Sequence, residues 1–97
     1  MTIEDIRAKM EEINPNALTA DGFDDCIVGY LEQCGKNAVF CYDAQKMAEK
    51  LASQCKQADS SLSDGDALEE AKEFLEFNTF GAYVGKNTPM WLFRFEE

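Results

Sequence analysis

Apolar residues recur over the first thirteen residues with the spacing of an amphipathic helix. Four of them, separated by three, four and three positions, fall on one helical face; they are Ile3, Ile6, Met10 and Ile13. Thr2 is a suitable N-cap, because Asp5 three residues later completes a capping-box pattern. Asn14-Pro15 ends the pattern, since the residue before a proline is disfavoured in the helical region. We therefore predict a helix over residues 2–13.

Two apolar runs joined by a glycine-containing turn follow between Asp21 and Asp43, in the stretch DGFDDCIVGYLEQCGKNAVFCYD. Their β-branched and aromatic residues favour strands, so the stretch predicts a β-hairpin. A two-residue turn at Gly35-Lys36 sets Leu31 opposite Phe40 and Tyr30 opposite Cys41. This register groups Ile27, Leu31 and Phe40 on one face. The other face then holds Cys26, Val28, Tyr30, Val39 and Cys41.

Both faces of this predicted hairpin are apolar, so both must be covered. Either the first helix and the loops cover the second face, or that face is an interaction surface for a partner or a second copy of the chain. We take these five residues as a candidate interaction surface.

The second half of the chain predicts two helices and a strand. A helical stripe follows Asp43, and a polar loop rich in serine and aspartate follows that helix. Ser63 or Asp66 can cap the next helix, which ends near Phe80 or continues to Val84. Its predicted inner face consists of Leu68, Ala71, Phe74, Leu75 and Asn78, widened by Phe77. After Pro89, the segment MWLFRF alternates as a strand does.

These elements predict an α+β fold in the order αββααβ, with the hairpin and the last strand forming a three-stranded antiparallel sheet packed by two to three helices. The chain has 97 residues. This length suits one domain, which we expect to span residues 1–97.

Charge narrows the range of functions. Nine Lys and Arg stand against nineteen Asp and Glu, with no His, which gives a formal net charge of −10. Direct binding to nucleic acid or to an anionic membrane is disfavoured, because the basic residues are scattered. A basic protein partner is favoured, and the stripe Glu69, Glu73 and Glu76 on the third predicted helix could imitate spaced phosphates.

The amino terminus is acidic where a secretory signal would be basic, and the longest apolar run, Met90 to Phe93, is too short to span a membrane. We expect a cytoplasmic protein. Its four cysteines contain no CxxC pair, so we predict free thiols and neither a metal site nor a cofactor.

The aspartates of DGFDD raise the question of a polar site. Their spacing does not match a calcium loop, and with no His any acid–base partner must be a Tyr, a Lys or another carboxylate. Turn formation explains them more simply. The polar cluster that a ligand site or a hydrolytic site would use consists of Asp21, Asp24, Asp25, Tyr42, Asn78 and Tyr83.

Three blocks together resemble a family of small, mostly uncharacterised bacteriophage and prophage proteins: DGFDDCIVGY, VFCYD before a helix, and EFNTFGAYVGKNTP. They cover most of residues 17–90. The resemblance implies a phage setting, expression in the bacterial host cytoplasm and an accessory role, and it carries over no catalytic residue.

Together these observations predict a non-enzymatic acidic protein that binds and modulates or inhibits a host protein, with nucleic-acid charge mimicry as the most concrete version. The partner would be a host factor such as a basic nucleic-acid-binding protein, and self-association into a homodimer or larger homo-oligomer is also expected. Two alternatives are a small-ligand-binding or hydrolytic protein using Asp21, Asp24 and Asp25, and a minor virion or assembly subunit.

Overall fold

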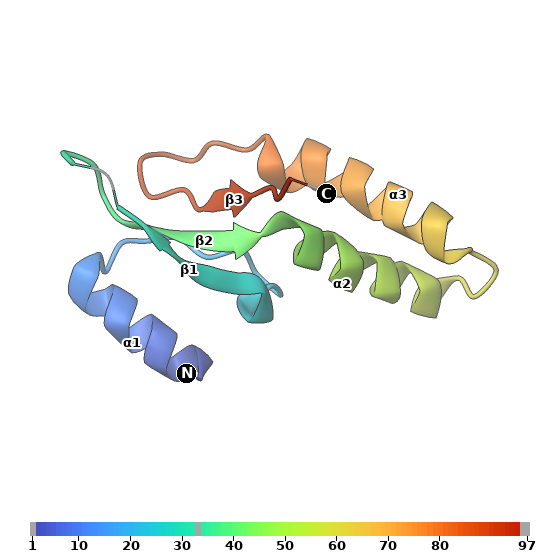
Figure 1. The fold of residues 1–97 in the computed structure, drawn as a ribbon, viewed down its shortest axis with the longest axis horizontal. Coiled ribbons are helices and arrows are strands. Elements are labelled where there is room, and N and C mark those ends of the chain that lie inside the picture. Colours follow the sequence, from blue (N-terminus) through green and yellow to red (C-terminus); the bar gives the residue numbers. More distant parts are fainter. Residues whose placement is uncertain (1, 33, 96–97) are drawn as a thin grey trace. The chain divides into compact units, whose positions relative to one another are not determined.

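The computed structural model describes residues 2–32 and 34–95, whose helices and strands follow the order αββααβ (Figure 1). The α+β class and this order are as predicted. By contact density the chain separates into two compact units. A sheet unit contains residues 1–43 and 83–92, and a helical unit contains residues 44–82 and 93–97. The single-domain prediction stays a prediction, and each unit is described by itself.

The sheet unit begins with helix α1 (Ile3–Ile13), which is capped as its sequence predicts. Thr2 Oγ1 accepts a hydrogen bond from the Asp5 amide at 3.2 Å, and the Asp5 carboxylate accepts one from the Thr2 amide at 3.1 Å. This capping box satisfies amides that the first helical turn leaves without a partner. At the other end, the Asn14 amide donates to the Met10 carbonyl and Pro15 prevents continuation.

A turn at Gly22, with φ of 85°, and a 3₁₀ turn at Asp24–Cys26 lead into the sheet. Strand β1 (Ile27–Leu31) pairs antiparallel with β2 (Val39–Asp43), which is the central strand and is buried at four successive positions. Strand β3 (Met90–Leu92) completes the order β1-β2-β3. Tyr42 of β2 and Trp91 of β3 are paired in the sheet, and the centroids of their rings lie 5.6 Å apart.

The sheet is mixed, so the prediction of a purely antiparallel sheet is wrong: β3 runs parallel to β2. The reason lies just before β3. The Asn87 carbonyl accepts a hydrogen bond from the Leu18 amide, and the Asn87 side chain bonds Asn14 and Asn37. Asn37 lies just before β2, so the chain is held at the start of β2 and enters β3 in the same direction.

The hairpin register also differs from the predicted one. Tyr30 lies opposite Phe40 and Leu31 opposite Val39, with a bulge between Ile27 and Gly29. Strand β1 ends at Leu31 and β2 begins at Val39, so they are not joined by a two-residue turn, and Asn37, just before β2, bonds Asn87. A one-residue change of register moves side chains to the opposite face. Phe40 therefore shares a face with Tyr30, and Val39 shares a face with Leu31.

The helical unit is an α-helical hairpin of α2 (Ala44–Ala58) and α3 (Asp64–Leu75), which lie side by side (Figure 1). Small residues on both helices allow close packing; the buried ones include Ala48, Ala52, Ala67 and Ala71. Ser63 caps α3 by accepting a hydrogen bond from the Asp66 amide at 3.2 Å. Lys56 pairs with Asp64, which holds the pKa of that carboxyl below its usual value.

A π-helical turn, Glu76–Phe80, continues α3 and ends before Gly81. A Cβ at position 81 would lie 3.0 Å from the Glu76 carbonyl oxygen, so glycine suits this close approach. The helical segment therefore ends near Phe80, the earlier of the two predicted ends. The backbone of this turn determines which way the side chains of Glu76–Phe80 point.

Candidate functional surfaces

The DGFDD aspartates are occupied by local contacts in the sheet unit. The Asp24 carboxylate accepts a hydrogen bond from Arg7 Nη2 at 2.7 Å, which forms an ion pair between α1 and the turn before β1. Asp25 accepts a hydrogen bond from the Cys26 thiol, with sulfur and oxygen 3.7 Å apart. Asp21 is exposed beside Gly22. The aspartates thus form and anchor a turn, which agrees with the simpler interpretation of this segment.

Tyr42 is the one member of the predicted polar cluster that is fully buried, with 0% of its surface exposed. Its hydroxyl oxygen accepts a hydrogen bond from the Ala20 amide at 2.8 Å. Burial raises the pKa of this hydroxyl, and the charges of Asp24 and Asp21 act in the same direction, whereas the Ala20 hydrogen bond and the charge of Arg7 oppose them. The structure therefore brings Asp21, Asp24 and Tyr42 together and adds Arg7. This buried hydroxyl therefore holds the backbone of Ala20 in place through the hydrogen bond.

The other two members of the cluster have different surroundings. The Asn78 side-chain amide donates to the Phe74 carbonyl at 3.0 Å, within its own helix, and Asn78 is exposed. Tyr83 is 78% exposed and lines a hollow beside Val39. Sequence reasoning joined these two residues to the aspartates on the basis of polarity alone, and their contacts in the structure serve other parts of the fold.

The candidate interaction surface is divided by the corrected register. Cys26, Val39 and Cys41 are buried, while Val28 and Tyr30 are about half exposed. Tyr30 also lies on the Phe40 face, opposite to that of Val39. The predicted five-residue surface is therefore wrong as a single patch, because three members belong to the interior and the others lie on or beside the edge strand β1.

Each face of the sheet has a hollow of its own. On the Phe40 face, a groove of about 310 Å³ lies between α1 and β1, with Ile6, Met10 and Tyr30 in its lining. On the Val39 face, a hollow of about 540 Å³ is lined by the connection between β1 and β2 and by the loop before β3. We call the second one the lysine hollow, because Lys36 and Lys86 border it; its apolar lining is Val39, Tyr83, Pro89 and Met90.

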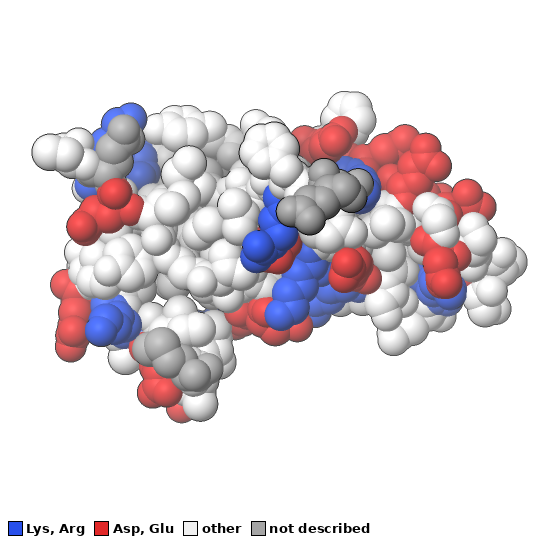
Figure 2. Space-filling model, in the orientation of Figure 1, with Lys and Arg blue, Asp and Glu red and all other residues white. Residues whose placement is uncertain are grey.

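The outer face of α3 is acidic. Glu69, Glu73 and Glu76 are exposed and lie on one side of the helix, while Ala67, Ala71 and Leu75 are buried on the other. Figure 2 shows Asp and Glu atoms gathered over this helix. The three glutamates thus form an exposed stripe, and the phosphate mimicry suggested for them stays a prediction.

Phe77 lies within the acidic face and is 88% exposed, and Phe74 is 53% exposed. The expectation that both belong to the inner face is wrong. Ala71 and Leu75, four residues apart, occupy that face. Phe74 and Phe77 are each offset from Leu75 by one or two positions, and so point away from it. We define the acidic face as Glu69, Glu73, Glu76 and Phe77.

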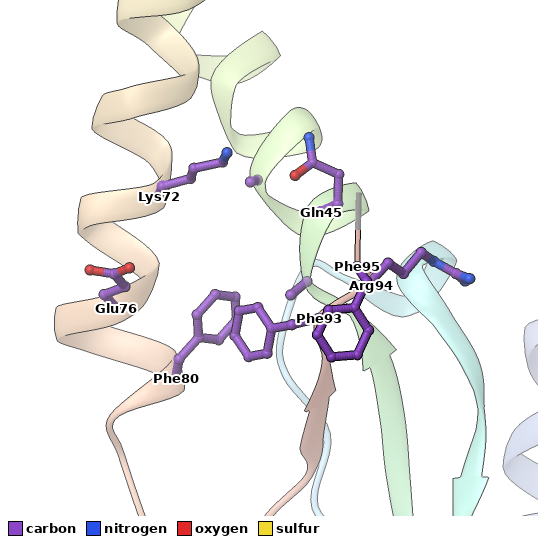
Figure 3. Close-up of a pocket in the computed structure, with 9 residues that line it drawn as sticks. Gln45, Lys72, Glu76, Phe80, Phe93, Arg94 and Phe95 are labelled. Carbon is purple, nitrogen blue, oxygen red and sulfur yellow. The ribbon is translucent and has the colours of Figure 1, made fainter. Parts of the chain in front are cut away.

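A further hollow in the helical unit has a volume of about 500 Å³. Figure 3 shows the aromatic rings of Phe80 and Phe93 packed against each other at its base, and their centroids are 5.3 Å apart in an edge-to-face arrangement. Lys72, Glu76 and Gln45 stand around it (Figure 3). Lys72 and Glu76 carry opposite charges, and the rings of Phe80 and Phe93 are apolar. This lining suits an apolar side chain better than it suits a charged ligand.

Three asparagines that sequence reasoning missed hold the loops of the sheet unit. Asn14 Nδ2 donates to the Ala38 carbonyl at 2.8 Å and to Asn87 Oδ1 at 3.0 Å. Asn87 Oδ1 also accepts a hydrogen bond from Asn37 Nδ2 at 2.9 Å. The sequence carries a faint sign of this: the dipeptide Lys-Asn occurs at positions 36–37 and again at 86–87. No feature of the sequence indicates that Asn37 and Asn87 are hydrogen-bonded to each other.

The four cysteines are free thiols, with Cys26 and Cys41 buried, Cys34 exposed and Cys55 partly buried. Within residues 2–32 and 34–95, no group of three or more metal-ligating side chains could hold an ion. In the same part of the chain, no helix has the length and apolar character to cross a membrane.

Comparison of the chain with protein-family models, with curated proteins and with solved structures finds no match.

Proposed function

We propose that this chain is a non-enzymatic, acidic accessory protein of phage type that binds a host protein in the bacterial cytoplasm and inhibits or modulates it. The observation that carries the proposal is the exposure of Phe77 on the acidic face of α3. Phe77 is 88% exposed and Phe74, three residues earlier, is 53% exposed, so α3 presents two aromatic rings that a partner can cover. The surroundings of Phe77 indicate what the partner is like.

Glutamates border this phenylalanine, so the partner surface is basic around an apolar pocket. Aromatic residues are frequent anchors at the centres of protein interfaces, where they fill such pockets. Complementary charges around the anchor increase the association rate and exclude wrong partners. The net charge of −10 adds a long-range attraction for basic proteins. Phe77 thus supplies contact area and the glutamates supply selectivity.

The spacing of the glutamates supports charge mimicry of a nucleic acid. Glu69 and Glu76 are separated by about 10 Å along the helix at ~1.5 Å per residue, with Glu73 between them. One DNA strand carries a phosphate every ~3.4 Å along its axis. Lys72 is exposed among these glutamates, so the net negative charge of the acidic face over this length is lower than that of a single DNA strand. A basic nucleic-acid-binding host protein is the partner that fits this surface.

Capture from bacterial lysate followed by competition with DNA tests the proposal. The full chain is expected to retain a basic nucleic-acid-binding protein at low salt, to release it at about 500 mM NaCl, and to lose it to added DNA. Replacement of Glu69, Glu73 and Glu76 by Gln should abolish capture. A matched control replaces the exposed Glu4, Glu11 and Glu12 of α1 by Gln, which changes net charge equally. Equal loss of binding in both variants would contradict a defined site on α3.

The two alternatives have less support. A ligand-binding or hydrolytic role would use carboxylates that are already bonded to Arg7 and to the Cys26 thiol, beside a Tyr42 hydroxyl without solvent access. An assembly role would require association with other copies or with virion proteins. Detection of the chain in purified particles would favour that role over host binding.

A further inference from the structure

The lysine hollow is bordered by positively charged side chains, which is unusual in so acidic a molecule. Lys36 and Lys86 stand on two different loops and border one apolar hollow, in a chain with a net charge of −10. Both lysines are exposed. The hollow between them is lined by Val39, Pro89 and Met90, with the exposed ring of Tyr83 at its side. This arrangement suits an apolar group that carries negative charges beside it.

Hydrogen bonds hold the two walls of the hollow together. Each lysine is followed by an asparagine, and Asn37 Nδ2 donates to Asn87 Oδ1 at 2.9 Å. In the second loop, Thr88 Oγ1 accepts a hydrogen bond from the Val84 amide and donates to the Gly85 carbonyl. Gly85 has φ of 114°, a conformation that favours glycine. The lysine backbones are thus positioned before anything binds, which reduces the entropic cost of binding.

The acidic face of α3 has the complementary chemistry. Phe77 is exposed directly after Glu76 and one helical turn after Glu73, so it is an apolar group with two exposed carboxylates near it. The lysine hollow offers an apolar surface bordered by two lysine side chains. We propose that the lysine hollow of one molecule binds the acidic face of a second copy of the chain, with Phe77 in the hollow and Glu73 and Glu76 beside Lys36 and Lys86.

Each molecule carries one surface of each kind, so this association is head to tail. Head-to-tail contacts extend into open chains unless the geometry closes them into a ring. In the open form, which is the one proposed, association increases with protein concentration and passes beyond two copies. Salt screens the ion pairs of this contact and also the repulsion between two copies that each carry a net charge of −10.

Sedimentation of the full chain between about 1 µM and about 1 mM, in about 50 mM salt, measures this association. The average mass is expected to rise beyond a dimer. Replacement of Lys36 and Lys86 by Gln, or of Glu73 and Glu76 by Gln, should weaken self-association at least tenfold. An equal mixture of these two variants should form a one-to-one complex and nothing larger, because each keeps one of the two surfaces.

Two control variants change charge elsewhere: Lys9 and Lys46 to Gln, and Glu11 and Glu12 to Gln, all of them exposed. Both should associate as the unaltered chain does, and circular dichroism verifies that every variant is folded. A chain that is monomeric throughout, that stops at two copies, or whose variants fail to form the one-to-one complex would overturn the proposal. Host-protein capture stays intact in the Lys36/Lys86 variant, so the two proposals fail separately.

Discussion

Three asparagine side chains join parts of the sheet unit that are distant in sequence. Asn14 and Asn87 are 73 positions apart and are linked by a hydrogen bond of 3.0 Å. Asn14 is also the only buried polar residue in the parts of the chain that the structure describes, with 8% of its surface exposed. Its side-chain oxygen accepts a hydrogen bond from the Asn16 amide at 3.1 Å. Both ends of this amide therefore have partners, as a buried polar group requires.

Replacing Asn14 by Ala is expected to lower the free energy of unfolding by about 2 kcal/mol, because the buried Ala38 carbonyl loses its Asn14 donor and Asn87 loses one of its contacts. Urea denaturation measures the change. The matched control is Asn78 to Ala, at an exposed residue bonded within its own helix, which should change stability by less than about 0.5 kcal/mol. Equal effects of the two substitutions would show that Asn14 does not hold these loops.

Sequence reasoning could not find these residues, because the choice of partner is a property of the fold. The same holds for Tyr42, which was taken as a candidate for chemistry and is an anchor for the Ala20 amide. Local signals were sufficient where the interaction is local. Thr2 with Asp5, and Ser63 with Asp66, are three residues apart and cap their helices as predicted.

At the scale of elements, periodicity identified α1, α2, α3 and all three strands, and it failed in the phase of α3. Aromatic residues dominated the predicted inner face, whereas the observed one consists of Ala67, Ala71 and Leu75. Small residues on two facing helices allow close approach, which leaves little need for a bulky ring between them. Phe74 and Phe77 were assigned to the interior for their hydrophobicity alone.

Two substitutions on this one helical segment test the corrected phase. Leu75 to Ala should lower the free energy of unfolding by about 3 kcal/mol, since Leu75 is 0% exposed and its removal leaves a cavity. Phe77 to Ala should change it by less than about 0.5 kcal/mol, because 88% of Phe77 is exposed. Denaturation at micromolar concentration measures both values. A cost for Phe77 equal to that for Leu75 would mean that the ring is buried in solution.

The direction of β3 and the register of the β1–β2 hairpin also could not be predicted from the sequence. The predicted two-residue turn ignored Asn37, whose side chain is bonded to Asn87 in another loop. That contact joins the end of the connection between β1 and β2 to the loop before β3, which then pairs with β2 in parallel. The correction matters for function, because it gives the two sheet faces different hollows instead of one shared apolar patch.

For the whole molecule, charge is the property with the widest consequences. The chain has a net charge of −10, so its carboxylates repel one another in the folded state. This repulsion is opposed by ion pairs such as Arg7 with Asp24 and Lys56 with Asp64, both at exposed or partly exposed positions. Exposed pairs contribute about 1 kcal/mol or less each. Because acidic residues outnumber basic ones by ten, repulsion should outweigh such pairs.

Raising NaCl from about 10 mM to about 150 mM shortens the screening length from about 30 Å to about 8 Å. We expect the unfolding temperature to rise over this range, because screening reduces repulsion more than it weakens two exposed ion pairs. The variant with Gln at Glu69, Glu73 and Glu76 should show a smaller rise, since these carboxylates share one helical face. A thermal scan at low protein concentration separates this effect from association. An unfolding temperature that falls with salt would show that ion pairing, not repulsion, dominates the surface of this protein.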